Sequence, residues 1–374
     1  MGARRWLEGV DAGAGLRVLG LGVALLAAAL LFDAEPLYVP GLVLMVLALL
    51  AGAWAALGIA GAAVERTLEA RRVLEGEPLH ARLTARGGAF GLVGAALEDP
   101  LLDAPYALPA GARSQRLRVD ARFARRGRRE LAPPALLLGD PLGLVSVRRE
   151  APGAPASVLV LPRIEPVVSA RSGQGDGTGA GGRRSVGGAA EVELDGLRPW
   201  QPGTSASRIH WPALARGAGL VERRLLPEAD ARPLVVLDPR HPEDEAALDA
   251  AVRATASLAV HLARRGGCAL LLPGDRRPTP LDAELHGWMP LHVRLALIEG
   301  AGTPAFATLS ARRGPVLLVM ARTPERPPRA LVASPSGHRV LVVPGELSGR
   351  RASFRVAGCV GYELARAAAP AEAA

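Results

Sequence analysis

The sequence predicts two N-terminal transmembrane helices, then a small β-sandwich-like domain and a C-terminal α/β domain. Two long apolar runs near the N-terminus predict the membrane helices. Short alternating stretches in the middle predict strands, and buried-type strands that alternate with helical stripes predict the α/β domain. With 374 residues, the chain is long enough for an anchor and two soluble domains. We expect a membrane anchor at residues 1–64 and a β-rich, sandwich-like domain at 65–170. A Gly-rich flexible loop is expected at 171–190, and the aromatic segment with the α/β domain at 191–374.

The two apolar runs are long enough to form a membrane hairpin. The first begins at residue 16 or 18 and ends at residue 32, and the second covers residues 38–64. At 1.5 Å per residue the first run spans about 25 Å, and the second is longer. A cleavable signal peptide would explain the first run alone, whereas a hairpin explains both. Arginines flank the outer ends, and the loop carries Asp33 and Glu35 but no base, so we expect a multi-pass protein of the cell membrane with both termini and both soluble domains in the cytoplasm.

The middle of the chain has the period-2 pattern of strands with one buried face. The expected strands cover residues 79–85, 116–123, 135–138 and 158–161. A turn is expected at residues 140–143, where Asp-Pro is followed by Gly. The arginines at residues 125–129 are expected on a solvated strand face or at a hairpin tip rather than in a contact site for lipid or an acidic partner.

The C-terminal part alternates continuous apolar strands with helical stripes. Strands are expected at residues 233–238, 268–272, 315–320 and 339–343, and helices at 243–265 and 282–299. Strands that are apolar on both faces predict a largely parallel sheet covered by helices on each side.

Composition excludes several classes of protein. The net charge is +9 and every basic residue is Arg, but the arginines are not interleaved with aromatics, so we expect no nucleic-acid partner. Proximity to anionic lipid headgroups explains the charge as well. Cys268 and Cys359 are too few for a disulfide framework or a zinc site, and we expect both to be buried in strands.

One segment, residues 197–211, concentrates tryptophan, proline and arginine in a chain with 3% aromatic residues. Arg-Pro-Trp followed by Gln-Pro-Gly predicts an extended stretch that leads into a turn. A helix is expected to start soon after, with Ser205 or Ser207 as its cap. The candidate interaction residues of this segment are Arg198, Trp200, Pro202, Gly203, Arg208, His210 and Trp211.

This segment resembles the signature of a family of bacterial membrane proteins, domain of unknown function 58. Residues 123–131 and the Asp-Pro-Leu-Gly-Leu of residues 140–144 resemble the same family. The resemblance implies a von Willebrand A-like fold for the C-terminal domain. It also implies a partner, an AAA+ ATPase of the MoxR type.

Folds of that kind often bind Mg²⁺ at the end of the first strand, through Asp and two hydroxyl residues. Here Asp238 takes the first position, but Arg240 and Pro242 stand near the expected hydroxyls. A guanidinium beside the carboxylate repels a cation and can replace it. Asp238 is therefore a weak metal candidate that we expect to pair with Arg240 or to cap the turn, and we expect no cofactor and at most weak Mg²⁺ binding.

The sequence favours a membrane-anchored, non-enzymatic interaction or scaffold protein that works with the ATPase in the assembly or maturation of client complexes. His210 has neither a nucleophile nor a paired carboxylate beside it in sequence, so we expect a buried structural histidine rather than a general base. We also expect the two indoles to be buried, as an architectural clasp between the soluble domains. The alternative is an enzyme that acts on envelope or protein substrates through residues 198–211.

Overall fold

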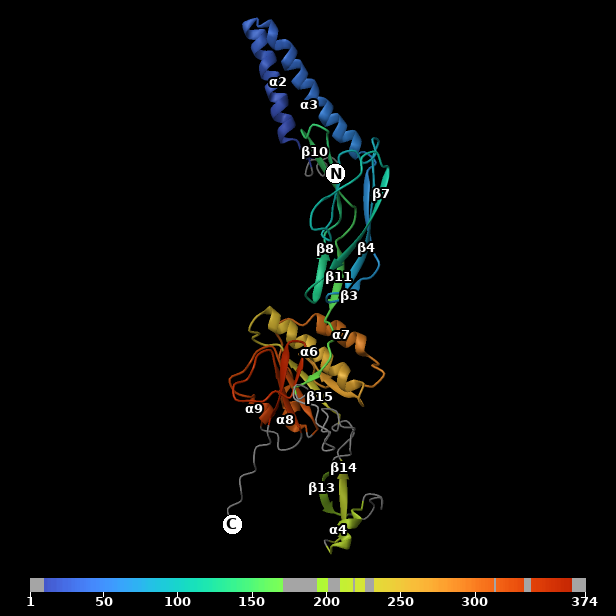
Figure 1. Ribbon diagram of the computed structural model, residues 1–374, viewed down its shortest axis with the longest axis vertical. Coiled ribbons are helices and arrows are strands. Elements are labelled where there is room, and N and C mark those ends of the chain that lie inside the picture. Colours follow the sequence, from blue (N-terminus) through green and yellow to red (C-terminus); the bar gives the residue numbers. More distant parts are fainter. Residues whose placement is uncertain are drawn as a thin grey trace, which may run out of the picture. The chain divides into compact units, whose positions relative to one another are not determined.

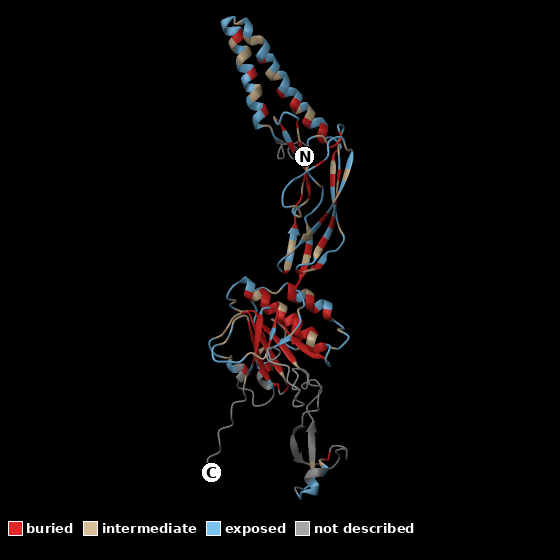
Figure 2. Ribbon diagram, in the orientation of Figure 1, coloured by how far each residue is buried: buried red, intermediate tan, exposed pale blue. Residues whose placement is uncertain are grey.

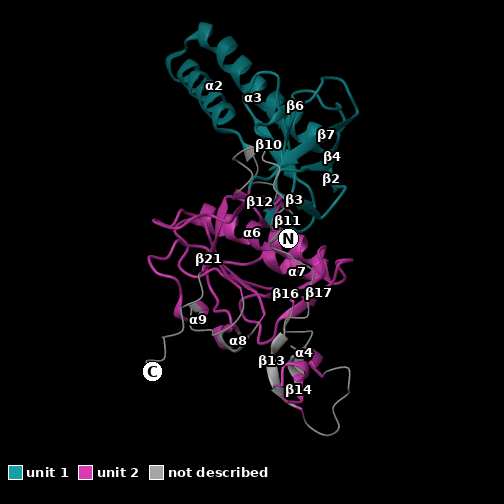
Figure 3. Cartoon of the chain, turned by 60° about the horizontal axis from the view of Figure 1, so that its bottom comes forward, with its two compact units in different colours: residues 1–124, 128–160 teal, residues 125–127, 161–374 magenta. Residues whose placement is uncertain are grey.

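The computed structural model describes seven stretches of the chain: residues 10–170, 194–200, 209–217, 219–225, 232–312, 314–332 and 338–364. The Gly-rich loop expected at 171–190 lies outside them. The chain divides into two compact units (Figure 3), of which the first comprises residues 1–124 and 128–160, and the second residues 125–127 and 161–374.

Two apolar helices open the described chain, as predicted (Figure 1). Helix α2 covers Gly13–Phe32 and α3 covers Tyr38–Ile59, with a short 3-10 turn, η1 (Glu35–Leu37), between them. Only 17% and 28% of their most apolar windows are buried, which contrasts with a core helix of a soluble protein (Figure 2). The second helix ends before residue 64, the predicted limit, because the chain enters strand β2 at Ala63.

The two helices approach closely at a pair of glycines. A Cβ atom on Gly22 would lie 2.9 Å from the carbonyl oxygen of Gly41, and one on Gly41 would lie 2.9 Å from the Leu26 side chain. Only glycine allows backbones to come so near, a device common between membrane helices.

The remainder of the first unit consists of three small sheets. Their strand orders are β1-β10-β9-β5-β6, β2-β4-β7 and β3-β11-β8. The strands are β1 (Val10–Asp11), β2 (Ala63–Leu68), β3 (Arg72–Leu74), β4 (Pro78–Arg86), β5 (Ala95–Glu98), β6 (Tyr106–Ala107), β7 (Ser114–Arg122), β8 (Gly127–Leu131), β9 (Ala135–Gly139), β10 (Ser146–Glu150) and β11 (Ala156–Leu161). One core contains residues of the first two sheets together with Ala51, Ala55 and Ile59 of α3. The end of α3 is therefore part of the folded unit.

The expected turn at residues 140–143 joins β9 to β10. The buried carboxylate of Asp140 accepts hydrogen bonds from the amides of Leu142, at 2.8 Å, and Val145, at 2.6 Å. The carbonyl of Leu144 accepts from the amide of Gly15 in the first turn of α2. This turn thus holds the start of the apolar hairpin on the sheet.

The second unit is built on an eight-stranded sheet with the order β12-β20-β21-β19-β18-β15-β16-β17. Its strands are β12 (Val168–Ser169), β15 (Leu234–Asp238), β16 (Cys268–Leu271), β17 (Thr279–Leu281), β18 (Val316–Met320), β19 (Arg339–Val343), β20 (Phe354–Val356) and β21 (Cys359–Leu364). Only the central four strands, β16-β15-β18-β19, are parallel, and the flanking pairs are antiparallel. The prediction of a largely parallel sheet holds for the centre alone. β17 and β21 each follow the preceding strand by a short connection and therefore pair antiparallel, and β12 adds to the edge from a distant part of the chain.

Helices cover both faces of this sheet, as predicted. One core contains side chains of α6 (Glu245–Ala263) and α7 (Trp288–Ala296), and the other contains Leu309 of α8 (Phe306–Ala311) and Leu331 of α9 (Arg329–Val332). Cys268 and Cys359 are buried free thiols in strands. Burial raises the pKa of each to about 12, so neither is a reactive thiolate at neutral pH.

The second predicted helix is shorter than expected and begins at Trp288 rather than at residue 282. The carboxylate of Asp282 accepts a hydrogen bond from the amide of His286, which forms a turn instead of a helix. Leu285 and Gly287 have positive φ angles of 63° and 76°, so the backbone leaves the helical region before α7 starts.

Candidate functional site

The aromatic segment forms a small hairpin with a short helix. Strand β13 (Leu194–Pro199) pairs antiparallel with β14 (Val221–Leu225), and Arg198 lies opposite Glu222 in the register. The amide of Trp200 donates to the carbonyl of Leu220, and the amide of His210 donates to that of Val221, both at 2.9 Å. The extended stretch predicted here is therefore present, and two candidate residues meet the same end of β14. Pro202, Gly203 and Arg208 lie outside the described residues.

The prediction that the indole of Trp211 is buried is wrong. Trp211 opens helix α4 (Trp211–Ala215) and is 57% exposed, whereas Trp200 is half-buried. The physical reason is the size of this element, since a helix of five residues on two strands has one small apolar face, which Ile209 already fills at 8% exposure. The clasp therefore has no support from Trp211.

Besides Trp211, two further apolar residues of this hairpin are exposed. Leu214, three residues later on α4, is 38% exposed, and Leu220, next to β14, is 47% exposed. Residues three apart lie on one face of a helix, so Trp211 and Leu214 form a continuous apolar strip. We call Trp211, Leu214 and Leu220 the α4 patch. Exposed aromatic and aliphatic side chains of this kind are typical of contact sites for proteins.

A second cluster lies where the central strands of the sheet end. Strand β15 has a parallel neighbour on each side, and the chain moves from one side to the other between them. In open α/β sheets such a switch point, at the carboxyl ends of the strands, is the usual place for ligands. Asp238 is the last residue of β15 and lies beside Met320 of β18 in the register.

The predicted pairing of Asp238 with Arg240 is present at this switch point. The Asp238 side chain is 1% exposed, and its two carboxylate oxygens accept from Nε of Arg240 at 2.8 Å and from Nη2 at 3.0 Å. The hydrogen bonds that Arg240 donates to Asp238 raise the pKa of Arg240 above its ordinary value. The guanidinium also lies 5.0 Å from the ring centroid of Phe306, within cation–π range. Both oxygens that a metal ion would need are thus occupied by a guanidinium.

Thr323 and Glu243, which the sequence analysis did not single out, join the loops near Asp238 and Arg240. The hydroxyl of Thr323 accepts from the amide of Gly345, and the amide of Thr323 donates to Glu243 at 2.6 Å. These contacts connect the loops after β15, β18 and β19. No local pattern singles these residues out, because their partners are about 20 and 80 positions away in sequence.

The arginine cluster at residues 125–129 is only partly the solvated face or tip that was expected. Arg125 and Arg126 both donate to the carboxylate of Asp249 in α6, and Arg125 also contacts Glu245. Arg126 is buried and donates further to the carbonyls of Leu295 and Ile298. The acidic partner of this cluster is therefore in the chain itself, and the prediction is wrong for Arg126.

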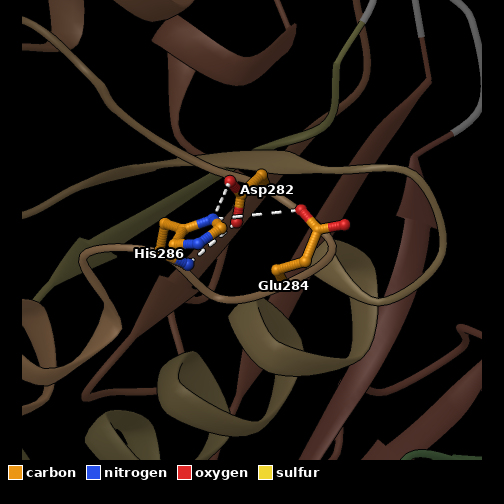
Figure 4. A group of neighbouring side chains, drawn as sticks. All are labelled: Asp282, Glu284 and His286. Carbon is orange, nitrogen blue, oxygen red and sulfur yellow. Dashed lines mark hydrogen bonds and ion pairs between the residues drawn. The ribbon is translucent and has the colours of Figure 1, made fainter.

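Asp282, Glu284 and His286 form a cluster that the sequence interpretation did not identify (Figure 4). Nδ1 of His286 lies 2.7 Å from Oδ2 of Asp282 and 3.9 Å from Glu284. The hydrogen bond with Asp282 raises the pKa of His286 and lowers the pKa of Asp282. Glu284 and His286 are largely exposed, so the contact is an ion pair at the surface.

We expect the imidazole of His286 to titrate above the ordinary histidine pKa of about 6.5. Because the folded pKa is raised, the stabilisation is fully present below the unfolded pKa and is lost as the pH rises through the folded one. NMR titration of the imidazole protons is the measurement. Asp282→Asn should return the midpoint towards about 6.5, and an unchanged midpoint would contradict this assignment.

Comparison with protein-family models matches none of them, and comparison with curated proteins finds no significant similarity.

Proposed function

We propose that the protein is a membrane-anchored interaction protein, without catalytic activity, that recruits a protein partner through the α4 patch. The exposure of Trp211 is the observation that carries this proposal. Tryptophan has the largest side chain of the patch and therefore gains the most hydrophobic free energy when a partner covers it. Contact hot spots are also enriched in tryptophan. The partner implied by the family resemblance is an AAA+ ATPase of the MoxR type.

The anchor in this proposal is the α2–α3 hairpin. Its exposed side chains are large and aliphatic or aromatic, including Leu30, Leu31 and Phe32. In water they would form an apolar surface far larger than soluble monomers tolerate, whereas lipid covers them without cost. α3 also enters the core of the first unit through Ile59, which joins anchor and domain rigidly.

The switch point supports an interaction role over metal-dependent chemistry. Asp238 is saturated by Arg240, which supplies a fixed positive charge where a divalent ion would otherwise sit. A metal ion would have to displace a bidentate, charge-assisted pair. We therefore propose that the site holds its own cation and binds Mg²⁺ weakly at most.

Trp211→Ala should weaken binding of the ATPase at least tenfold and leave the protein stable. The indole is mostly exposed, so its removal should change the free energy of unfolding by less than about 1 kcal/mol. Binding is measured by biolayer interferometry between the full chain in nanodiscs and the purified MoxR-type ATPase of the same genome.

Met289→Ala is the matched control, because Met289 is an apolar residue of α7 with 46% exposure, outside the patch. It should bind as the unmodified chain does. Equal binding by Trp211→Ala and the unmodified chain would refute the patch. Loss of a measured hydrolytic activity in Trp211→Ala or His210→Ala would instead establish the enzymatic alternative.

We propose that both termini and both folded units lie in the cytoplasm. The support is the charge pattern, with Arg4 and Arg5 before α2, Arg17 in its first turns and an acidic loop after it. A cysteine introduced at Ala374 should resist a membrane-impermeant maleimide in intact cells. A cysteine introduced at Ala34, between the two helices, should react. The reverse labelling pattern would overturn the orientation, and the two buried native thiols contribute no background.

A further inference from the structure

The first unit encloses an apolar pocket at the foot of the α2–α3 hairpin. Its volume is about 270 Å³. Its walls come from the first turns of α2, the second half of α3 and the start of β10. They include Leu16, Leu19, Ala48, Gly52, Ala55 and Val147. Every lining residue is Ala, Gly, Val, Leu or Ile, so no side chain there can bind water.

Small residues create this space. The helices touch at Gly22 and Gly41, but a Cβ atom on Gly52 would meet no atom within 4 Å. Ala48 and Ala55, on the same helix, are also too short to fill the gap. The pocket therefore results from small side chains of the hairpin at the end where α3 joins the sheets of the first unit.

The occupant must be apolar. A dry cavity of about 150 Å³ already accepts a benzene ring, and apolar cavities exclude water. An empty pocket of this size would leave its walls without van der Waals partners on one side. Within a membrane, the apolar groups that reach such a site from the side are lipid acyl chains.

Two arginines lie next to lining residues, one in sequence and one through a hydrogen bond, and they favour a negatively charged lipid. Arg17 is exposed on α2, between the lining residues Leu16 and Leu19. Arg149 of β10 donates to the carbonyl of Ile59, another lining residue, at 2.8 Å. A cation beside an apolar pocket at the end of a span complements the phosphate of an anionic lipid.

We propose that this pocket is a phospholipid site that takes one acyl chain of an anionic phospholipid, with the phosphate beside Arg17. The inference rests on the proposed membrane anchor and adds a specific ligand to it. Because an acyl chain gains no hydrophobic free energy by moving from bilayer to pocket, selectivity comes from packing and from the charge of the headgroup.

Native mass spectrometry of the full chain in detergent, after removal of lipid, provides the test. Dioleoyl phosphatidylglycerol should form a one-to-one complex that survives a tenfold excess of dioleoyl phosphatidylcholine. A Cβ atom on Gly52 meets no atom within 4 Å, so Gly52→Phe should place its ring in the pocket and reduce the complex at least tenfold. Ala48→Leu, a second filling variant, should reduce it as well.

Gly20→Phe is the matched control, since Gly20 lies on α2 with no atom within 4 Å of its Cβ position and does not line the pocket. It should bind phosphatidylglycerol within twofold of the unmodified chain. Arg17→Gln should abolish the preference for phosphatidylglycerol over phosphatidylcholine.

The pocket assignment is overturned if the unmodified chain forms no one-to-one complex, or if Gly52→Phe and Ala48→Leu bind as much as Gly20→Phe. A preference that persists in Arg17→Gln overturns the headgroup contact. A chain that alkaline carbonate releases from membranes refutes the anchor itself, so the two failures are distinguishable.

Discussion

Asp249→Leu should lower the stability of the second unit by about 3–5 kcal/mol, because it removes the carboxylate that pairs with the buried guanidinium of Arg126. The side chains of Arg126 and Asp249 are 4% and 7% exposed. The substitution keeps the carbonyls of Leu295 and Ile298 as acceptors for Arg126, but carbonyls do not neutralise a charge. Hydrogen exchange of the α6 amides in the full chain, which reports the free energy of opening, is the measurement.

The double variant Arg126→Met, Asp249→Leu should recover most of this loss, since an apolar pair of similar volume replaces a buried ion pair at little cost. Glu245→Leu is the matched control, because Glu245 contacts Arg125 from the same helix but is 79% exposed. Its effect should stay below about 1 kcal/mol. If Asp249→Leu costs no more than Glu245→Leu, the buried pair does not stabilise the unit.

Arg66→Met should destabilise the first unit by a similar amount, about 3–5 kcal/mol at neutral pH. Arg66 donates to Asp99 at 3.0 Å and to the carbonyls of Leu131 and Ala132, and the two charged side chains are 4% and 0% exposed. Burial raises the pKa of Asp99, even though the amide of Leu101 and Arg66 both oppose the shift. Without Arg66, the amide of Leu101 still lowers the pKa of Asp99 but the guanidinium no longer does, so this pKa should rise further.

The loss in Arg66→Met should shrink as the pH falls. A carboxyl whose folded pKa is raised favours the folded state below the unfolded pKa, and this contribution disappears as the pH rises through the folded pKa. Hydrogen exchange of the β2 and β4 amides at pH 7 and at pH 4.5 measures the difference. A deficit of equal size at both pH values would show that the buried charge is not its cause, and Arg66→Met with Asp99→Asn should remove the pH dependence.

Contacts between residues close in sequence were predictable. The pairing of Asp238 with Arg240 involves residues two apart after a buried strand, and the turn at Asp140 is set by its own Asp-Pro and Gly. Local contacts need little chain closure, so the residue types alone determine them.

Burial of the aromatic segment was not predictable from residue type. Trp211 is the kind of residue that usually enters a core, and the expectation of a buried indole followed from that frequency. The outcome depended on how much surface the surrounding element offers. Among the side chains that the structure describes in this hairpin, Ile209 is buried and Trp211 is exposed. The hydrophobic pattern of the fifteen residues 197–211 contains no information about how much surface of other elements is available to cover Trp211.

The two apolar helices, the strand-rich middle and the central β15–α6–β16 alternation could be predicted from the residues alone, because hydrophobic period and length are properties of a local stretch. Tertiary structure alone decided that Arg126 is buried on Asp249, more than a hundred positions away, and that four central strands are parallel while their neighbours are not. It also decided that small residues of α2 and α3 leave a pocket beside β10. These features depend on which distant surfaces meet, and that is set by the packing of the whole unit rather than by any one segment.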